Sequence, residues 1–234
     1  MITIYPYKDL GHADHGWLDA RHHFSFASYY NPKRVGFGTL LVINDDKVAA
    51  GRGFAMHPHD NMEIITYVRQ GAITHRDSMG NTGRTAAGDV QVMSAGTGVQ
   101  HSEQNLEHED TRLYQIWIKP NKRNVAPRWE AKAFPKEPVT GTLPILVSGQ
   151  PEHDGKNALF IHADAAIYGG NLKVGTAIEL PIKHQAYVLA SVGSFTVNGI
   201  TLNQGDGAEI TDEKNLSIAA TSDAEILVID VPAR

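Results

Sequence analysis

Short apolar runs separated by turn-forming residues dominate this chain of 234 residues. Largely apolar runs occupy residues 40–43, 113–118 and 226–229, and glycine, asparagine and aspartate separate such runs, as at residues 44–46. Alternation on this short scale is typical of β-strands and turns, and no segment has a long helical period. The pattern therefore predicts an all-β protein.

Prolines and charged residues concentrate between residues 120 and 144, with Pro127, Pro135 and Pro138 among them. Such a stretch is typical of a connection between folded units. A chain of 234 residues can bury one large β core or two small ones. We therefore expect two domains, residues 1–135 and residues 136–234.

Composition excludes several classes of protein and site. The chain has no run of eighteen apolar residues, and its start, residues 1–6, lacks the charged and apolar regions of a signal peptide, which predicts a cytoplasmic protein without a membrane partner. The absence of cysteine excludes disulfides, thiolate catalysis and cysteine-zinc sites. A formal net charge of −5 argues against a broad nucleic-acid surface, which is normally basic.

Two short motifs carry metal-ligand side chains at alternate positions: His57-Pro58-His59 and His101-Ser102-Glu103. In a strand, residues two apart point to the same face. If the two strands face each other, three imidazoles and one carboxylate converge, a donor set that suits a first-row transition metal and leaves positions open for substrate or dioxygen. One His-x-His among twelve histidines is weak evidence alone, since most histidines have surface or core roles.

The surroundings of both motifs strengthen the metal hypothesis. Gly51 stands six positions before His57, Glu63 four positions after His59, and Gly71 closes the apolar run 64–68. The turn Gly88-Asp89, the strand-like residues 90–93 and the segment Ser94-Ala95-Gly96-Thr97-Gly98 then lead to the second motif. This arrangement resembles the two sequence motifs of the cupin superfamily, small β-barrels with a metal inside.

Departures from the common cupin motifs point to one branch. The spacing from Glu63 to Gly71 is one residue longer, Ser94 takes a proline position, and two extra residues precede His101. These departures, together with the sequences His-Pro-His, Ser-Ala-Gly-Thr-Gly and His-Ser-Glu, give the chain a resemblance to the pirin family. The N-terminal segments 16–18, 21–27 and 29–32 are also similar to pirins.

The second half of the chain repeats the first faintly. Tyr187-Val188 and Gly193 parallel Tyr67-Val68 and Gly71, and Gly205-Asp206 parallels Gly88-Asp89. Counting from these matches places non-ligands opposite the four donors: Glu179, Pro181, Ile218 and Ala220. Together with the pirin resemblance, this implies a bicupin of two jelly-roll-like barrels, with one metal site in residues 1–135 and a degenerate barrel in residues 136–234.

Two glutamates compete as the carboxylate ligand. Glu63 shares strand parity with His57 and His59, so spacing alone does not exclude it. The pirin resemblance favours Glu103 and gives Glu63 a supporting place, holding an imidazole. Asn105 follows at the same parity as Glu103, but an asparagine can equally satisfy a turn.

A rival metal pair is His22-His23. Adjacent strand residues point to opposite faces, so we expect these two histidines to pack and hydrogen-bond near the barrel mouth.

The donor set accepts Fe(II), Cu, Ni, Co, Mn or Zn, and intrinsic affinity favours copper. The resemblance implies iron, so one Fe(II) per chain is the expected cofactor.

The resemblance further implies quercetin 2,3-dioxygenase activity. In this reaction O2 opens the central ring of a flavonol, and carbon monoxide is released. Glu103 would take the proton of the 3-hydroxyl as general base, and a small aromatic molecule and O2 would be the partners. The alternative is a non-enzymatic, metal-responsive protein that binds a transcriptional or other partner, although no basic patch or amphipathic helix supports it. A structural or storage protein would not explain four donors at matching parity.

Overall fold

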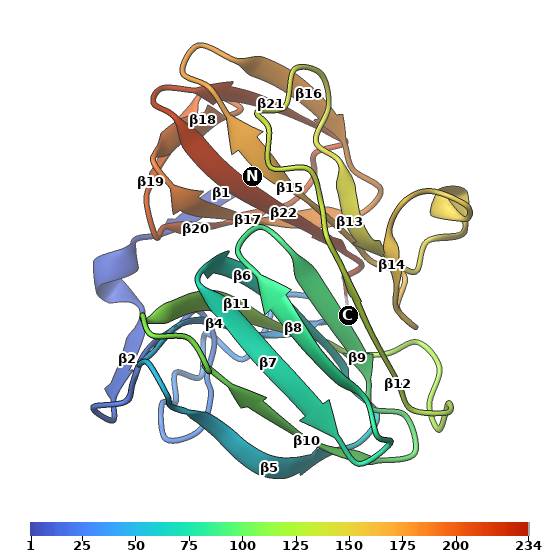
Figure 1. Ribbon diagram of the computed structural model, residues 1–234. Helices are drawn as coiled ribbons and strands as arrows, with labels where there is room; N and C mark the ends of the chain where they lie inside the picture. The colour runs from blue at the N-terminus through green and yellow to red at the C-terminus, as the bar shows by residue number, and fades with distance from the viewer. Residues whose placement is uncertain (234) are drawn as a thin grey trace.

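The alternating apolar segments form strands β1 to β22 within residues 1–233, the part of the chain that the computed structural model describes. Four sheets result, a seven-stranded and a four-stranded sheet in each of two stacked domains (Figure 1). The two sheets of a domain face each other and enclose an interior without joining into a closed barrel. The predicted all-β architecture of two jelly-roll-like units is confirmed.

The N-terminal domain is the lower one in Figure 1. Its large sheet contains, in spatial order, β12 (Arg128–Lys132), β9 (Val90–Ser94), β6 (Glu63–Gln70), β11 (Thr111–Ile118), β4 (Leu40–Val48), β3 (Leu18–His22) and β2 (Gly11–Asp14). Its small sheet contains β5 (Gly53–His59), β10 (Val99–Gln104), β7 (Ala72–Asp77) and β8 (Thr82–Ala86).

The C-terminal domain repeats the arrangement of a seven-stranded and a four-stranded sheet, although the edge strands of its large sheet differ in direction and chain order. Its large sheet contains β1 (Ile2–Tyr5), β20 (Gly207–Ile210), β17 (Gln185–Val192), β22 (Ala224–Val231), β15 (Ala166–Leu172), β13 (Ile145–Ser148) and β14 (Leu159–Phe160). Its small sheet contains β16 (Ala177–Pro181), β21 (Asn215–Ala220), β18 (Ser194–Val197) and β19 (Ile200–Asn203). The faint sequence repeat thus reflects a duplicated fold.

Two short 3-10 helices, η1 (Tyr7–Asp9) and η2 (Pro151–His153), complete the regular structure of residues 1–233. None of the helices in that range is long and apolar enough to cross a membrane.

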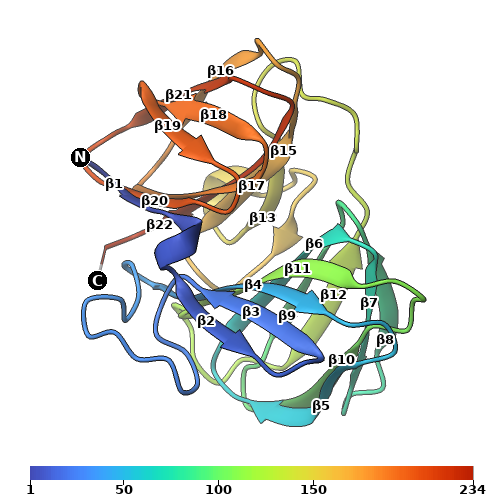
Figure 2. The same cartoon turned by 90° about the vertical axis from the view of Figure 1, so that its left-hand side faces the viewer.

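The strands at the two ends of the N-terminal half have pairing partners that spacing did not reveal. Strand β1 crosses to the other domain and pairs antiparallel with β20 (Figure 2). Strand β12 lies inside the segment 120–144 that we expected to be a connection, and it extends the N-terminal sheet by pairing with β9. A domain boundary between residues 135 and 136 stays a proposal that falls between β12 and β13.

The outer faces of the two large sheets pack against each other and form one apolar core shared by the domains. The core includes Ile43, Ile65, Tyr114 and Ile116 from one sheet and Tyr187, Leu189, Leu227 and Ile229 from the other. A buried ion pair accompanies them: the Arg69 guanidinium contacts the Asp45 carboxylate at 2.5 Å and also donates to Ser191 Oγ at 2.7 Å. Because every alternate residue of these strands faces the partner domain, the remaining residues face inward.

Residues 44–46 do not separate two strands, contrary to their interpretation in the sequence. Strand β4 runs through them from Leu40 to Val48, and all three polar side chains are buried. Each faces a specific environment: Asn44 contacts His22 and Asp45 pairs with Arg69, while Asp46 lies in the N-terminal interior. Buried partners allow polar residues to continue a strand where sequence pattern alone indicates a turn.

The interior of the C-terminal domain is filled by apolar side chains. The pair Ile178–Ile218 stands on β16 and β21, the strands that correspond to those of His57 and His101. Glu179 and Pro181, which counting placed opposite the histidines, are exposed, so the alignment is shifted by one residue. Ile218 and Ala220 are buried as expected.

Candidate metal centre

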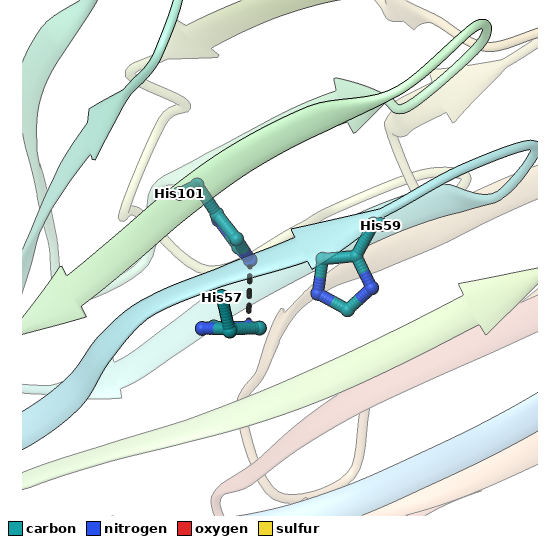
Figure 3. A group of neighbouring side chains, drawn as sticks. All are labelled: His57, His59 and His101. Atoms are coloured by element: carbon teal, nitrogen blue, oxygen red, sulfur yellow. Dashed lines mark hydrogen bonds between the residues drawn. The ribbon is translucent and has the colours of Figure 1, made fainter.

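Three imidazoles meet on the inner face of the small N-terminal sheet. His57 and His59 alternate on β5, and His101 lies on the adjacent strand β10, where its backbone pairs with that of His57 (Figure 3). One ring nitrogen from each of the three residues lies within 4.8 Å of the other two. His57 and His59 therefore share one face of their strand, as the alternation of strand side chains predicts.

The free nitrogens of the three rings can be assigned from their neighbours. His57 Nδ1 lies 2.7 Å from the carbonyl oxygen of Ala55, which can only accept, so His57 Nδ1 carries the proton and Nε2 is free. His57 Nε2 lies 3.1 Å from His101 Nε2. His59 Nε2 is buried and has no hydrogen-bond partner. All three Nε2 atoms thus belong to one polar pocket.

This arrangement fits a metal ion. Two nitrogens bound at right angles to one metal at about 2.1 Å would lie about 3.0 Å apart, close to the spacing of the His57 and His101 Nε2 atoms. A buried, unpartnered nitrogen such as His59 Nε2 costs about 1–3 kcal/mol unless something binds it. Imidazole suits Fe, Cu, Ni, Co and Zn alike, so the donors indicate a transition metal without selecting one. Within residues 136–233 no such cluster occurs.

Burial keeps two of the three rings neutral. It lowers the pKa of His59 to about 4, with a further decrease from the neighbouring His57 that Glu103 and Asp60 partly oppose. Burial also lowers the pKa of His101 to about 4, although Glu103 raises it. Neutral imidazoles retain the lone pairs that a metal requires, so protons compete weakly with the metal at pH 7.

Glu103 lies beside the three histidines, and its carboxylate reaches across the interior to the large sheet. Its Oε1 accepts hydrogen bonds from Thr66 Oγ1 at 2.9 Å and Gln91 Nε2 at 2.7 Å, while Oε2 accepts from Gln115 Nε2 at 2.9 Å. The β5–β10 register is irregular between His101 and Glu103. Three donors orient this buried carboxylate, and its coordination of the metal stays a proposal.

Glu63 occupies the opposite face of the large sheet. Its Oε2 accepts a hydrogen bond from Ser94 Oγ at 2.7 Å, and the backbone N–H of His162 in the other domain also donates to the carboxylate. The chain passes from the small sheet into the large one between His59 and Glu63, so strand parity is not preserved across that step. Burial raises the pKa of Glu63 to about 7, although these two donors lower it.

A cavity opens next to His57 and Glu103 on the inner side of the N-terminal domain. Phe26, Phe54 and Trp117 supply aromatic walls. Asn44, Asp46 and Gln115 supply polar groups, and His22, Leu18 and Ala20 complete the lining. The Trp117 ring also lies edge-on to His59, with ring centres 5.0 Å apart, so the aromatic wall touches the histidine cluster.

Asp46 is a cavity residue that the sequence did not indicate, because residues 44–46 have the composition of a turn. Its carboxyl group is completely buried, and Oδ1 has no hydrogen-bond partner. Burial raises the pKa of Asp46 well above its usual range, and the negative charges of Asp45 and Glu103 raise it further. The direction of this shift favours the neutral carboxylic acid, the form that could donate a hydrogen bond into the cavity.

The remaining candidates have structural partners. His22 Nδ1 lies 2.7 Å from Asn44 Oδ1 at the cavity, whereas His23 Nδ1 lies 3.0 Å from the Tyr187 hydroxyl at the domain interface. The two rings point to opposite faces, as strand geometry predicts. Asn105 closes a turn, since its side-chain amide donates to the carbonyl groups of Val48 and Glu109.

Comparisons with known proteins agree with this architecture. The family model described as Pirin matches residues 5–118, and that described as Quercetinase C-terminal cupin domain matches residues 145–231. The chain is 51% identical over 232 residues to a protein of Caulobacter vibrioides named pirin-like protein, covering 98% of this chain and 99% of the relative. It is 43% identical to a protein of Escherichia coli K12 named quercetin 2,3-dioxygenase, with 99% of each chain covered.

A solved structure extends the comparison to the metal. The bacterial pirin YhhW of Escherichia coli, in complex with nickel(II), superposes with a TM-score of 0.92 at 40% identity and covers 100% of both chains.

We expect the purified protein to carry about one transition-metal ion per chain, held in the N-terminal domain. His57→Ala, His59→Ala and His101→Ala should each leave the site nearly empty, because each removes one of three converging nitrogens. Elemental analysis measures the loading, with His12→Ala, an exposed histidine paired with Asp19, as the matched control. Two equivalents of metal, or full loading of His101→Ala, would contradict a single site.

We expect Glu63 to make stability fall as pH rises. Its folded-state pKa of about 7 exceeds the ordinary value of 4.5, so the folded chain holds the proton longer than the unfolded chain does. The contribution is complete below about pH 4.5 and is lost by pH 7, with a change of up to about 3 kcal/mol in the free energy of unfolding. Denaturant titrations at several pH values test this against Glu63→Gln, and a wild-type-minus-variant difference that does not change with pH would refute it.

Proposed function

This chain belongs to the pirin family, and on that premise we propose that it is a metal-dependent dioxygenase that opens the flavonol ring of quercetin-like substrates with O2 and releases carbon monoxide. One observation carries the proposal: His57, a member of the three-imidazole cluster, and Glu103 together line a cavity with aromatic walls. An aromatic substrate in this cavity would meet an acid–base group and the metal site together. A small aromatic molecule and O2 are the proposed partners, and a cytoplasmic location stays a prediction.

The cavity suits a flat aromatic molecule. Phe26 and Trp117 meet edge-to-face with ring centres 5.4 Å apart, and Phe54 packs in the same way against Trp17 at 5.3 Å. Such contacts restrict ring motion and leave apolar faces toward the cavity. These walls would orient the rings of a flavonol and exclude water from the reacting centre.

Glu103 is the proposed general base, and it is also the proposed fourth metal ligand beside His57, His59 and His101. Thr66, Gln91 and Gln115 hold its carboxylate in one orientation, and Gln115 is itself held because Trp117 Nε1 donates to its Oε1 at 3.1 Å. Glu103 Oε2 has one donor among these residues and can still accept the proton of a substrate 3-hydroxyl. The aromatic wall and the base therefore share one hydrogen-bond network.

When bound, the divalent metal, Fe(II) as our first choice, supplies a positive charge that lowers the cost of forming the substrate anion. Asp46 lines the same cavity, and burial raises the pKa of its carboxyl group, which favours the protonated form. A neutral acid there can donate a hydrogen bond to a carbonyl or hydroxyl oxygen of the substrate. Asp46 and Glu103 would then act as donor and acceptor in one cavity.

We expect Glu103→Gln to reduce turnover by about 10²–10⁴-fold, since the substitution removes the base and its charge. The turnover of Glu103→Asp should lie between that of Glu103→Gln and that of the wild type, because aspartate keeps the carboxylate on a shorter side chain. Glu63→Gln is the matched control on the opposite face and should keep near wild-type turnover. Steady-state assays with elemental analysis of each variant separate lost chemistry from lost metal. Full activity in Glu103→Gln, with metal binding abolished in Glu63→Gln, would reverse the assignment of the two glutamates.

We expect the metal-loaded protein to consume quercetin in air, with loss of its near-visible absorption and release of carbon monoxide in step. An analogue without the 3-hydroxyl should be stable, because it offers no acidic proton to Glu103 and no anionic oxygen. Chelation should stop the reaction, and added Fe(II) should restore it in the wild type but not in His57→Ala.

Carbon monoxide is the decisive readout, because flavonols also oxidise slowly in air without ring opening of this kind. Equal rates for metal-free and metal-loaded protein would overturn the dioxygenase proposal. A metal-responsive binding protein would then be the better hypothesis.

A further inference from the structure

A second buried imidazole stands behind His101, on the side away from His57. His75 lies on β7, which pairs with β10, and its Nδ1 is 3.4 Å from His101 Nδ1. The other nitrogen of His75, Nε2, lies 3.1 Å from Asp77 Oδ2. Both side chains of this pair are completely buried. Asp77, His75 and His101 therefore form a continuous polar chain that ends at the metal-binding cluster.

Asp77 is the acceptor at the end of this chain. Its Oδ1 accepts the backbone N–H groups of Met79 at 2.9 Å and Asn81 at 3.0 Å, and its Oδ2 accepts the Asn81 side-chain amide at 2.9 Å. Burial raises the pKa of Asp77, but the hydrogen bonds from Asn81, His75 and Met79 outweigh it and lower the pKa below the usual value. An ionised carboxylate has no proton to donate, so the proton between the two residues belongs to His75 Nε2.

The proton on His75 Nε2 determines the state of His101. A neutral His75 with a proton on Nε2 presents an unprotonated Nδ1 to His101. The contact between the two Nδ1 atoms is then a hydrogen bond only if His101 Nδ1 carries a proton, which leaves His101 Nε2 unprotonated. That is the nitrogen that faces His57 and the centre of the cluster. His57 reaches the same tautomer independently, through the carbonyl oxygen of Ala55.

We propose that His75 and Asp77 are positioning residues of the metal centre, which fix His101 in the tautomer whose Nε2 is free to bind the metal. Outer partners of this kind orient metal-binding histidines, and their loss typically costs 10–100-fold in metal affinity. Here the partner of His101 is a second imidazole, and the carboxylate stands one step further away.

Neighbouring residues hold the hydrogen-bonded series Asp77–His75–His101 in place. The Trp129 ring stacks on the His75 ring, with ring centres 4.8 Å apart and planes 8° from parallel. Trp129 comes from β12, in the segment that joins the two domains. A Cβ atom at Gly83 would lie 2.2 Å from the Trp129 ring, so glycine is required there for the stack to form. The connecting segment therefore contributes to the environment of the metal site.

Two substitutions at His75 separate hydrogen bonding from packing. In His75→Asn the amide oxygen can replace Nδ1 as acceptor for His101, whereas in His75→Gln the longer side chain can reach Asp77 but offers no acceptor at the Nδ1 position. Titration calorimetry with Ni²⁺ should show His75→Asn within a few-fold of the wild type and His75→Gln weaker by about 10–100-fold. Glutamine is closer to histidine in size, so a role in packing alone predicts the reverse order. Equal affinities in the two variants, or that reverse order, would overturn the proposal.

Asp77→Asn tests the direction of the hydrogen bonds that link Asp77, His75 and His101. The two backbone N–H groups keep the amide oxygen at the Oδ1 position, so the amide nitrogen faces His75 and donates to its Nε2. The proton of His75 then moves to Nδ1, and His101 is left protonated on Nε2. Long-range proton–nitrogen NMR spectra of metal-free protein, with His101→Ala to assign the signals, should show this reversal of tautomer, accompanied by weaker Ni²⁺ binding.

An unchanged His101 tautomer in folded Asp77→Asn would contradict the proposed direction. If Asp77→Asn does not fold, the pair of His75 variants still decides the question. Neither the calorimetry nor the NMR measurement requires turnover, so failure of the dioxygenase proposal would leave both results interpretable.

Discussion

The packing of the two large sheets against each other is the constraint on which the rest of the structure depends. Once Ile43, Ile65 and Tyr114 are committed to the domain interface, only the alternate residues of the same strands can line an interior. Each domain then has one further sheet with which to close that interior. In the N-terminal domain this small sheet brings the histidines, and the large sheet brings the polar groups that Glu103 contacts.

The duplicated fold shows what a polar interior requires. In the C-terminal domain, Ile178 and Ile218 face each other at the positions of His57 and His101, and apolar packing alone fills the space. In the N-terminal domain each buried polar group needs a partner, because an unpaired one costs about 1–3 kcal/mol. Thr66, Gln91 and Gln115 meet this need for Glu103. Two of the buried side-chain atoms without partners, His59 Nε2 and Asp46 Oδ1, lie at the histidine cluster and at the cavity, where a metal and a substrate could bind.

Hydrogen-bond direction gives the cluster its chemical state. The carbonyl oxygen of Ala55 and the carboxylate of Asp77 are both hydrogen-bond acceptors. Ala55 accepts the proton of His57 Nδ1 directly, whereas Asp77 accepts from His75, which in turn contacts His101. The outcome at His57 and His101 is the same, a free Nε2 toward the centre. Burial acts in the same sense by keeping His59 and His101 neutral. The site is thus prepared for a cation by its surroundings rather than by the ligands alone.

The sequence by itself determined the features that depend on local periodicity. Alternation with a period of two indicated strands, placed His57 and His59 on one face, and separated His22 from His23. The faint repeat between Gly71 and Gly193 indicated the duplication. Only the tertiary structure decided which polar groups share an interior, because their partners come from strands distant in sequence. Glu63 lost its parity with His59 when the chain changed sheets, the turn-like residues 44–46 became a buried strand, and His75 met His101 through the pairing of β7 with β10. Spacing along one strand cannot encode contacts that arise between sheets, and the chemistry of this site is built from those contacts.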